Sequence, residues 1–361
     1  MSFSLNKKSV MATVLASLLL TPAVVFAQWF PLEIDVWDPP FNTELKRKTE
    51  NYTPLKKAEK SWKICTSIPH LKDPYWAAVN YGLIDQAKQL GISLRLYEAG
   101  GYSNLEVQRK QIKDCMDSGG DGLVISSISA DGLNDFVEQY ISAGKPVVDM
   151  INGMTSTLST ARIGVNFYDP GFMVGSYIRE RHADSTEEIQ VGWFPGPDGA
   201  AWVAQGTSGF NKALEGSNIK VVVTSMGDTG RATQGKLVEA ALKAHQELDY
   251  IAGTTVSADA AVDLLRRSGM KDKIKVLAYY YGPGVDRGIR RKSILAAPSD
   301  LQSLQARMSI DTVVRALEGK PFFRHAGPKV IMIDAKNIKS FDTSTSLPPR
   351  GFRPIFSIND W

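Results

Sequence analysis

Short apolar runs alternate along most of this chain with segments whose apolar residues recur every three or four positions. In the first such segment, Asp73 and Pro74 are typical of a helix N-cap and first helical position, and Gly91 is a typical stop. The apolar residues between them share one face of a helix: Trp76, Val79, Leu83, Ala87 and Leu90. The pattern therefore predicts an amphipathic helix that follows a strand at 63–68.

The same alternation occurs in two runs joined by a bridging stretch at 162–166. The expected strands lie at 63–68, 92–97, 122–126 and 146–151, then at 189–194, 219–225, 250–254 and 274–280. Apolar strands that alternate with helices are typical of parallel sheets buried on both faces. The sequence thus predicts an α/β fold with two doubly wound parallel-sheet lobes and a ligand cleft between them.

A length of 361 residues suits two such lobes better than one compact core. We expect the first lobe to comprise 60–164 with 300–329, and the second to comprise 165–299 with 330–361. Residues 28–59 form an N-terminal extension of irregular chain or short strands that covers the edge of a lobe.

Residues 1–27 have the three parts of a secretory signal peptide. Lys7 and Lys8 precede a mostly apolar stretch from Ser9 to Phe26, and small residues precede a cleavage site after Ala27. A retained membrane anchor is the alternative, although Pro22 favours cleavage. No later segment offers the roughly 20 apolar residues of a membrane helix. We therefore expect a periplasmic protein without membrane insertion after cleavage.

Aromatic residues gather directly after the predicted strands, where open parallel sheets bind their ligands. These segments are Asp73-Pro74-Tyr75-Trp76, Asn166-Phe167-Tyr168, Tyr279-Tyr280-Tyr281, and Pro195–Asp198 followed by Trp202. Electron-rich ring faces suit a methylated ammonium group or a sugar ring. Packing in a core is the alternative for each aromatic residue. The residues expected to bind ligand are Asp73, Tyr75, Trp76, Phe167, Tyr280 and Asp300, and Asp149 and Asn152 are further polar candidates.

Charge and motifs exclude several other functions. The net charge of +4 includes Lys7 and Lys8 of the leader, so nothing points to a nucleic acid partner. The one basic run, within 287–292, is typical of a solvated face. The four histidines lack metal-binding spacing, and the chain has neither a nucleophile elbow nor a phosphate-binding loop. We expect no catalytic residues, no metal and no cofactor.

The chain contains two cysteines, Cys65 and Cys115. A pair in an oxidising compartment is either bridged or remains as two buried thiols, and a single sequence leaves both alternatives open.

Several segments resemble the ribose-type periplasmic binding proteins and, more closely, the TorT family of trimethylamine-N-oxide (TMAO) sensors. The specific strings are Lys72-Asp73-Pro74-Tyr75-Trp76, Glu98-Ala99-Gly100-Gly101-Tyr102-Ser103, Pro195-Gly196-Pro197-Asp198 and Gly351-Phe352-Arg353-Pro354. The resemblance spans about Lys57 to Phe356. It implies that Tyr75, Trp76 and Tyr280 contact the ligand. Phe167 replaces a tryptophan of the family, and Leu301 replaces a glutamine.

The resemblance implies a function. The protein is expected to bind TMAO and to act with the periplasmic sensor domain of a TorS-like histidine kinase, in a two-component system that controls TMAO respiration. The alternatives are a solute-binding protein that delivers a sugar or methylated amine to an ABC transporter, and a secreted enzyme.

Overall fold

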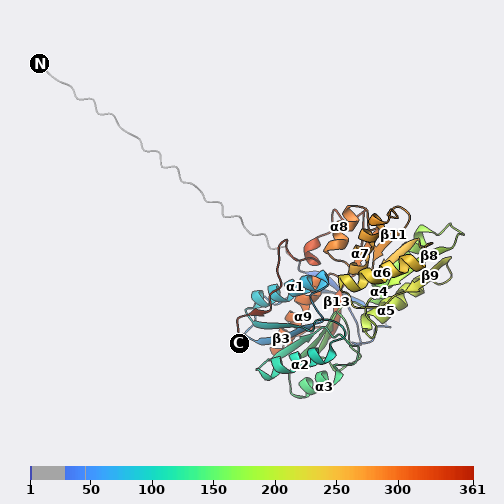
Figure 1. Ribbon diagram of the computed structural model, residues 1–361. Coiled ribbons are helices and arrows are strands. Elements are labelled where there is room, and N and C mark those ends of the chain that lie inside the picture. Colours follow the sequence, from blue (N-terminus) through green and yellow to red (C-terminus); the bar gives the residue numbers. More distant parts are fainter. Residues whose placement is uncertain (2–28, 45) are drawn as a thin grey trace.

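A computed structural model describes residues 29–44 and 46–361, together with Met1. Two bodies lie side by side (Figure 1): α1–α3 and α9 surround the sheet that contains β3, and α4–α8 surround the sheet that contains β8. The predicted signal peptide lies outside the described residues, apart from Met1. Two α/β units with parallel sheets confirm the predicted fold class.

The larger sheet has the strand order β15-β4-β3-β5-β6-β7-β13-β1-β2. The strands from β4 to β13 run parallel, and the outer pairs β15–β4, β13–β1 and β1–β2 run antiparallel. The bounds are β1 Leu32–Val36, β2 Lys48–Tyr52, β3 Lys63–Ile68, β4 Ser93–Glu98, β5 Gly122–Ile125, β6 Val147–Met150, β7 Ala161–Ile163, β13 His325–Pro328 and β15 Ser357–Ile358.

Helices cover both faces of this sheet. Apolar side chains of α2 (Leu105–Asp117) and α3 (Asn134–Ser142) form one core with β3, β5 and β6. On the other face α1 (Pro74–Leu90) packs against α9 (Gln302–Leu317). A disulfide joins Cys65 of β3 to Cys115 of α2, so the structure has the bridged alternative.

The smaller sheet has the order β11-β10-β8-β9, all parallel. Its strands are β8 Ile189–Phe194, β9 Ile219–Thr224, β10 Tyr250–Gly253 and β11 Lys275–Ala278. One face carries α4 (Tyr168–Arg181) and α5 (Ala201–Leu214), which pack closely together. The other face carries α6 (Arg231–Ala244), α7 (Thr255–Arg267) and α8 (Pro283–Arg290).

The chain crosses between the two bodies more than once. After β12 (Ala296–Ser299) it enters α9 and β13 of the larger body, and then β14 (Ile331–Asp334) pairs with β12. A short 3-10 helix, η1, spans Thr343–Thr345. The last strand, β15, pairs with β4 of the larger sheet, although we expected 330–361 in the second lobe. The lobe boundaries stay a prediction.

The N-terminal extension consists of short strands at the edge of the larger sheet. The β1–β2 hairpin joins that sheet through β13. Arg47 forms ion pairs with Asp35 of β1 and Asp169 of α4, so the extension also contacts the smaller body. In the part of the chain that the structure describes, no helix is both long and apolar enough to span a membrane.

A candidate ligand-binding site between the two bodies

A cavity of about 270 Å³, counting the solvent at its mouth, lies where the carboxyl ends of both parallel sheets meet. Its walls come from the start of α1, the loops after β4, β6 and β11, the crossing before α4, the start of α5 and the loop before α6. The lining residues are Asp73, Tyr75, Trp76, Tyr102, Ile151, Asn152, Phe167, Trp202, Thr229 and Tyr280.

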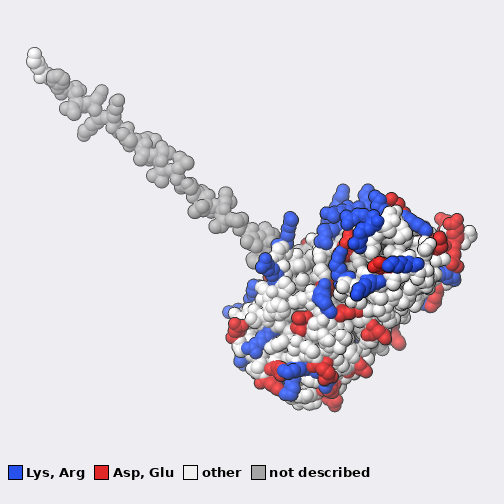
Figure 2. All heavy atoms as spheres, in the orientation of Figure 1, with Lys and Arg blue, Asp and Glu red and all other residues white. Residues whose placement is uncertain are grey.

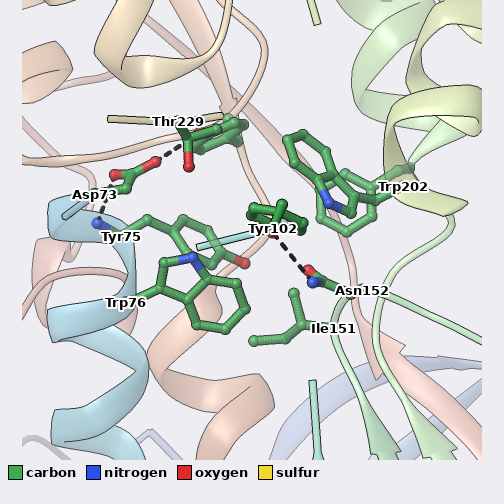
Figure 3. Close-up of a pocket in the computed structure, with 10 residues that line it drawn as sticks. Asp73, Tyr75, Trp76, Tyr102, Ile151, Asn152, Trp202 and Thr229 are labelled. Atoms are coloured by element: carbon green, nitrogen blue, oxygen red, sulfur yellow. Dashed lines mark hydrogen bonds between the residues drawn. The ribbon is translucent and has the colours of Figure 1, made fainter. Parts of the chain in front are cut away.

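Aromatic rings form most of the wall (Figure 3). The ring of Tyr75 lies edge-on to those of Trp76 and Tyr280, with centroid distances of 5.3 Å and 5.2 Å. Trp202 is edge-on to Tyr280 at 5.9 Å and tilted against Phe167 at the same distance. Rings at steep angles to one another surround a small space with several negatively polarised faces, which favours a group with positive charge spread over methyls.

The local sequence explains how α1 presents its two rings. The side chain of Asp73 caps the helix by accepting a hydrogen bond from the backbone N–H of Tyr75 at 2.9 Å. Pro74 occupies the first helical position, where its missing N–H would have no helical partner. Tyr75 and Trp76 therefore stand on the first turn, at the carboxyl end of β3, and both line the cavity.

Asp73 also connects the two bodies. Its carboxylate accepts hydrogen bonds from the hydroxyl of Tyr280 at 2.7 Å and from that of Thr255 at 3.3 Å. Burial raises the pKa of Asp73 above its usual value, although these hydrogen bonds and the one from Tyr75 act in the opposite direction. The cavity thus has one buried carboxylate, held by groups from both sheets.

Asp300 stands behind the cavity wall. Its carboxylate accepts hydrogen bonds from the hydroxyl of Tyr75 at 2.6 Å and from Nε2 of Gln305 at 2.7 Å. Burial raises its pKa to about 6, against the effect of these two donors. Asp300 positions the ring of Tyr75 but is not among the residues that line the cavity.

Most of the remaining polar groups of the wall already have protein partners. Asn152 donates to the hydroxyl of Tyr102 at 3.1 Å and to the carbonyl oxygen of Ser127 at 2.7 Å. The hydroxyl of Thr229 is hydrogen-bonded to His70 at 2.9 Å. In contrast, the indole Nε1 of Trp202 is buried and has no hydrogen-bond partner among the described residues. Trp202 itself is part of the cavity wall, where its indole also lies beside the ring of Tyr102.

A further contact closes one side of the cleft. Asp228, in the loop before α6, lies 2.8 Å from Nζ of Lys72 and 3.3 Å from Nε2 of His70. Burial alone would raise the pKa of Asp228, but hydrogen bonds from His70 and Lys72 outweigh it and lower the pKa to about 2. The two bodies are therefore held together by charged groups beside the cavity.

Five of the six expected ligand-binding residues lie together at this cavity, and the sixth, Asp300, supports it from behind. Tyr279 and Tyr281, the neighbours of Tyr280, are fully buried and lie outside the lining.

Tyr102, Ile151, Trp202 and Thr229 line the cavity although they are not among the residues expected to bind ligand, and Asn152 is a further polar candidate. Tyr102 follows β4 and Trp202 follows β8. Trp202 already stands among the aromatic residues noted after strands, and the same rule applied to β4 points to Tyr102.

Among the described residues, no group of three or more His, Cys, Asp or Glu side chains is placed to hold a metal ion. The side chains around the cavity instead provide apolar surface, one carboxylate and a few hydrogen-bond donors, a combination typical of small-molecule sites.

Comparisons with known proteins agree with this geometry. The model of a periplasmic binding protein domain matches residues 64–321. The periplasmic protein TorT of Escherichia coli K12 is 32% identical over 305 residues, which cover 84% of this chain and 86% of TorT.

Two solved structures are informative. A solute-binding protein of an ABC transporter from Bradyrhizobium sp. BTAi1, with bound bis-tris, is 46% identical with a TM-score of 0.79, covering 92% of this chain and 99% of that one. TorT in its complex with the TorS sensor domain in the presence of TMAO is 30% identical with a TM-score of 0.74, covering 82% and 99%. The chain therefore belongs to the periplasmic binding protein family, within which it is a TorT-like periplasmic binding protein.

Proposed function

We propose that the aromatic cavity binds TMAO and that the protein acts with a TorS-like sensor histidine kinase in the control of TMAO respiration. The observation that carries the proposal is a small cavity with six aromatic residues and one buried carboxylate in its wall. In this proposal Asp73, Tyr75, Trp76, Phe167 and Tyr280 contact the ligand, and Asp300 acts through Tyr75.

The chemistry of TMAO matches that wall. Its three methyl groups share the positive charge of the nitrogen, and ring faces attract such groups without a full ion pair. Its negative oxygen needs a hydrogen-bond donor. Trp202 lines the cavity, and its indole N–H is the candidate donor.

A sugar suits the wall less well. Each buried sugar hydroxyl needs hydrogen-bond partners, because an unpaired polar group in an apolar site is unfavourable. The hydroxyls of Tyr75 and Tyr280 and the amide of Asn152 are already bonded to protein groups. We therefore favour a methylated amine or amine oxide over a carbohydrate.

Ligand binding is coupled to signalling through lobe closure. Groups from both bodies line the cavity, so a ligand that contacts all of them has higher affinity for the closed arrangement and shifts the equilibrium towards it. The expected signal peptide places the protein in the periplasm, where it meets the sensor domain of a membrane kinase. Its structural relative TorT is solved in complex with the TorS sensor domain.

Delivery of an amine to an ABC transporter is a second candidate function. The Bradyrhizobium solute-binding protein, at 46% identity, is more similar to this chain than TorT is, and its bound bis-tris is a tertiary amine with several hydroxyl groups. Both candidates share the fold, and they differ in the membrane partner; a transporter protein would deliver either a sugar or a methylated amine.

Calorimetric titration of residues 28–361 with TMAO tests the ligand, with glycine betaine and ribose as comparison compounds. We expect saturable TMAO binding that is at least tenfold weaker in Trp76→Ala, because the variant loses a desolvated ring face. The control variant Trp361→Ala removes a tryptophan that stacks on Arg95 outside the cavity and should bind normally. Absence of TMAO binding, with clear binding of ribose, would overturn the ligand assignment.

A deletion strain separates the two candidate partners. Loss of TMAO-dependent expression of the respiratory genes with normal TMAO uptake supports the kinase. Loss of uptake with normal expression supports the transporter instead.

A further inference from the structure

Positive charge is concentrated in one part of the sequence. Residues 231–292 contain 12 Lys and Arg but 7 Asp and Glu, a net charge of +5, whereas the whole chain carries +4. The remainder of the chain is therefore slightly negative. The net charge of the whole chain, which is close to zero, does not reveal this uneven distribution.

The fold brings these charges onto one face. Helices α6, α7 and α8 lie next to one another on the same side of the smaller sheet, opposite α4 and α5. Figure 2 shows Lys and Arg side chains gathered over this region, while acidic side chains are spread over both bodies and include a cluster at the outer end of the smaller body.

Several of these cations are free to bind a partner. Six exposed Lys and Arg side chains have no carboxylate within 4.0 Å in the described part of the chain. They form what we call the basic face: Lys236, Arg267, Lys271, Arg287, Arg291 and Lys292. By contrast, Arg231, Lys243 and Arg290 are paired with acidic side chains on the same helices or adjacent ones. Unpaired like charges attract an oppositely charged surface over several ångströms.

A groove runs between α6 and α7 within the basic face. Small residues, Ala232, Gly235 and Ala260, line it together with Leu264, and Lys236 and Arg267 stand on its two sides. A Cβ atom placed on Gly235 would meet nothing within 4 Å, so the groove is open at that point. Small residues between two helices allow a third helix to approach and pack its ridge into the groove.

The groove leads towards the ligand cavity. Helix α6 begins at Arg231, two residues after Thr229 of the cavity wall. Helix α7 begins at Thr255, whose hydroxyl binds Asp73. The first turns of α6 and α7 therefore lie beside the cavity, whereas Arg267, Lys271, Arg291 and Lys292 lie at or beyond the C-terminal ends of α7 and α8.

The composition of the face favours a protein partner over a lipid surface. Surfaces that bind lipid bilayers insert large apolar or aromatic side chains. None of the exposed large apolar side chains found among the described residues lies within 231–292. Glu239 and Asp263 also line the groove, and their negative charges oppose anionic lipid while discriminating between protein partners.

We propose that the basic face and the α6–α7 groove dock an acidic helix of a membrane protein's periplasmic domain. This inference rests on the proposed function, since the sensor domain of the kinase is the expected partner, and it locates the contact surface. Complementary charge would mainly accelerate association and select the partner.

Charge reversal tests the surface. The full mature chain with Lys236→Glu and Arg267→Glu is compared with Lys212→Glu and Lys220→Glu, which make the same charge change on α5 and β9 of the same body. We expect the first pair to weaken binding of the purified TorS-like sensor domain at least tenfold, with TMAO affinity unchanged, and the second pair to bind normally. If both double variants bound the sensor domain with equal affinity, the basic face would not be the docking surface.

Cross-linking distinguishes failure of the surface from failure of the proposed function. A photoreactive residue is placed at position 236 or 212 in cells that carry epitope-tagged kinase and epitope-tagged permease. An adduct with the kinase from position 236 alone supports both proposals. An adduct with the permease from position 236 alone supports the surface and overturns the kinase partner. Adducts from position 212, or from neither position, would refute the basic face as the docking surface. Vesicle binding would refute it too, if the wild type binds phosphatidylglycerol vesicles and the variant with Lys236→Glu and Arg267→Glu does not.

Discussion

Replacing Tyr280 by phenylalanine removes one hydrogen bond between the two bodies and leaves an aromatic ring in the cavity wall. The hydroxyl of Tyr280, after β11, donates to the carboxylate of Asp73, at the start of α1, over 2.7 Å. Both residues are almost completely buried. The bond forms only while the two sheets face each other across the closed cavity, so the substitution destabilises the closed arrangement in particular.

The size of the effect follows from the charge on the acceptor. A hydrogen bond to a charged group contributes about 1.5–3 kcal/mol. After the substitution Asp73 keeps its helix-capping bond to Tyr75 and the longer bond from Thr255 at 3.3 Å, so part of the carboxylate is left without a donor. Since about 1.4 kcal/mol corresponds to a tenfold change, the apparent dissociation constant should rise by about 10- to 100-fold.

Calorimetric titration with TMAO measures this change, and thermal unfolding shows that the variant is folded. Tyr281→Phe is the matched control, because Tyr281 donates to the carboxylate of Asp286 at 2.6 Å within the same body. We expect the control to bind TMAO like the wild type. An affinity of Tyr280→Phe within twofold of the wild type would refute the idea that this bond stabilises closure.

Three predictions concern stability. A pKa of about 6 for Asp300, against the usual 3.8, means that the folded state binds its proton more tightly. The wild type should therefore lose about 2 kcal/mol of stability as pH rises from 4 to 6, and Asp300→Asn should lack this loss in denaturant titrations; equal pH profiles would contradict the assignment. Replacing Cys65 and Cys115 by alanine removes a disulfide that closes a loop with a sequence separation of 50, so the free energy of unfolding should fall by about 4 kcal/mol. The denaturation midpoint should be lower than that of the wild type, and adding a reductant should not change it further. A Cβ atom at Gly209 would lie 2.0 Å from a backbone oxygen of α4, so Gly209→Ala should destabilise by about 1–3 kcal/mol, whereas Gly235→Ala, in open space on α6, should stabilise by about 0.5–1 kcal/mol in the same assay.

Local patterns in the sequence were sufficient to predict β3 and the start of α1, which contribute part of the cavity wall. The apolar run at 63–68 is β3, and the N-cap at Asp73 with Pro74 begins α1 as expected. Both signals are local: a cap is decided by the residue and the next turn, and a buried strand is a short apolar run. The same signals placed Tyr75 and Trp76 at the mouth of the first sheet.

Helix α9 is an element that local sequence patterns do not predict. The sequence pattern predicts no helix at 302–317, yet the structure has one whose first 13 of 16 residues are buried. Many of them are polar, including Gln302, Gln305 and Asp311, and they are hydrogen-bonded to neighbouring elements. A helix enclosed on all sides has no apolar stripe, so hydrophobic periodicity does not reveal it.

The sequence by itself determined the class of the fold, the alternation of strands and helices, and the aromatic residues that follow several strands. The tertiary structure decided which of these residues share one cavity, because contacts such as that between Asp73 and Tyr280 join positions 207 residues apart. It placed Tyr102 and Trp202 in the wall, moved Asp300 behind it, and turned a scattered set of cations into the basic face. Local signals depend on neighbouring residues, whereas these arrangements depend on how two separately packed sheets meet.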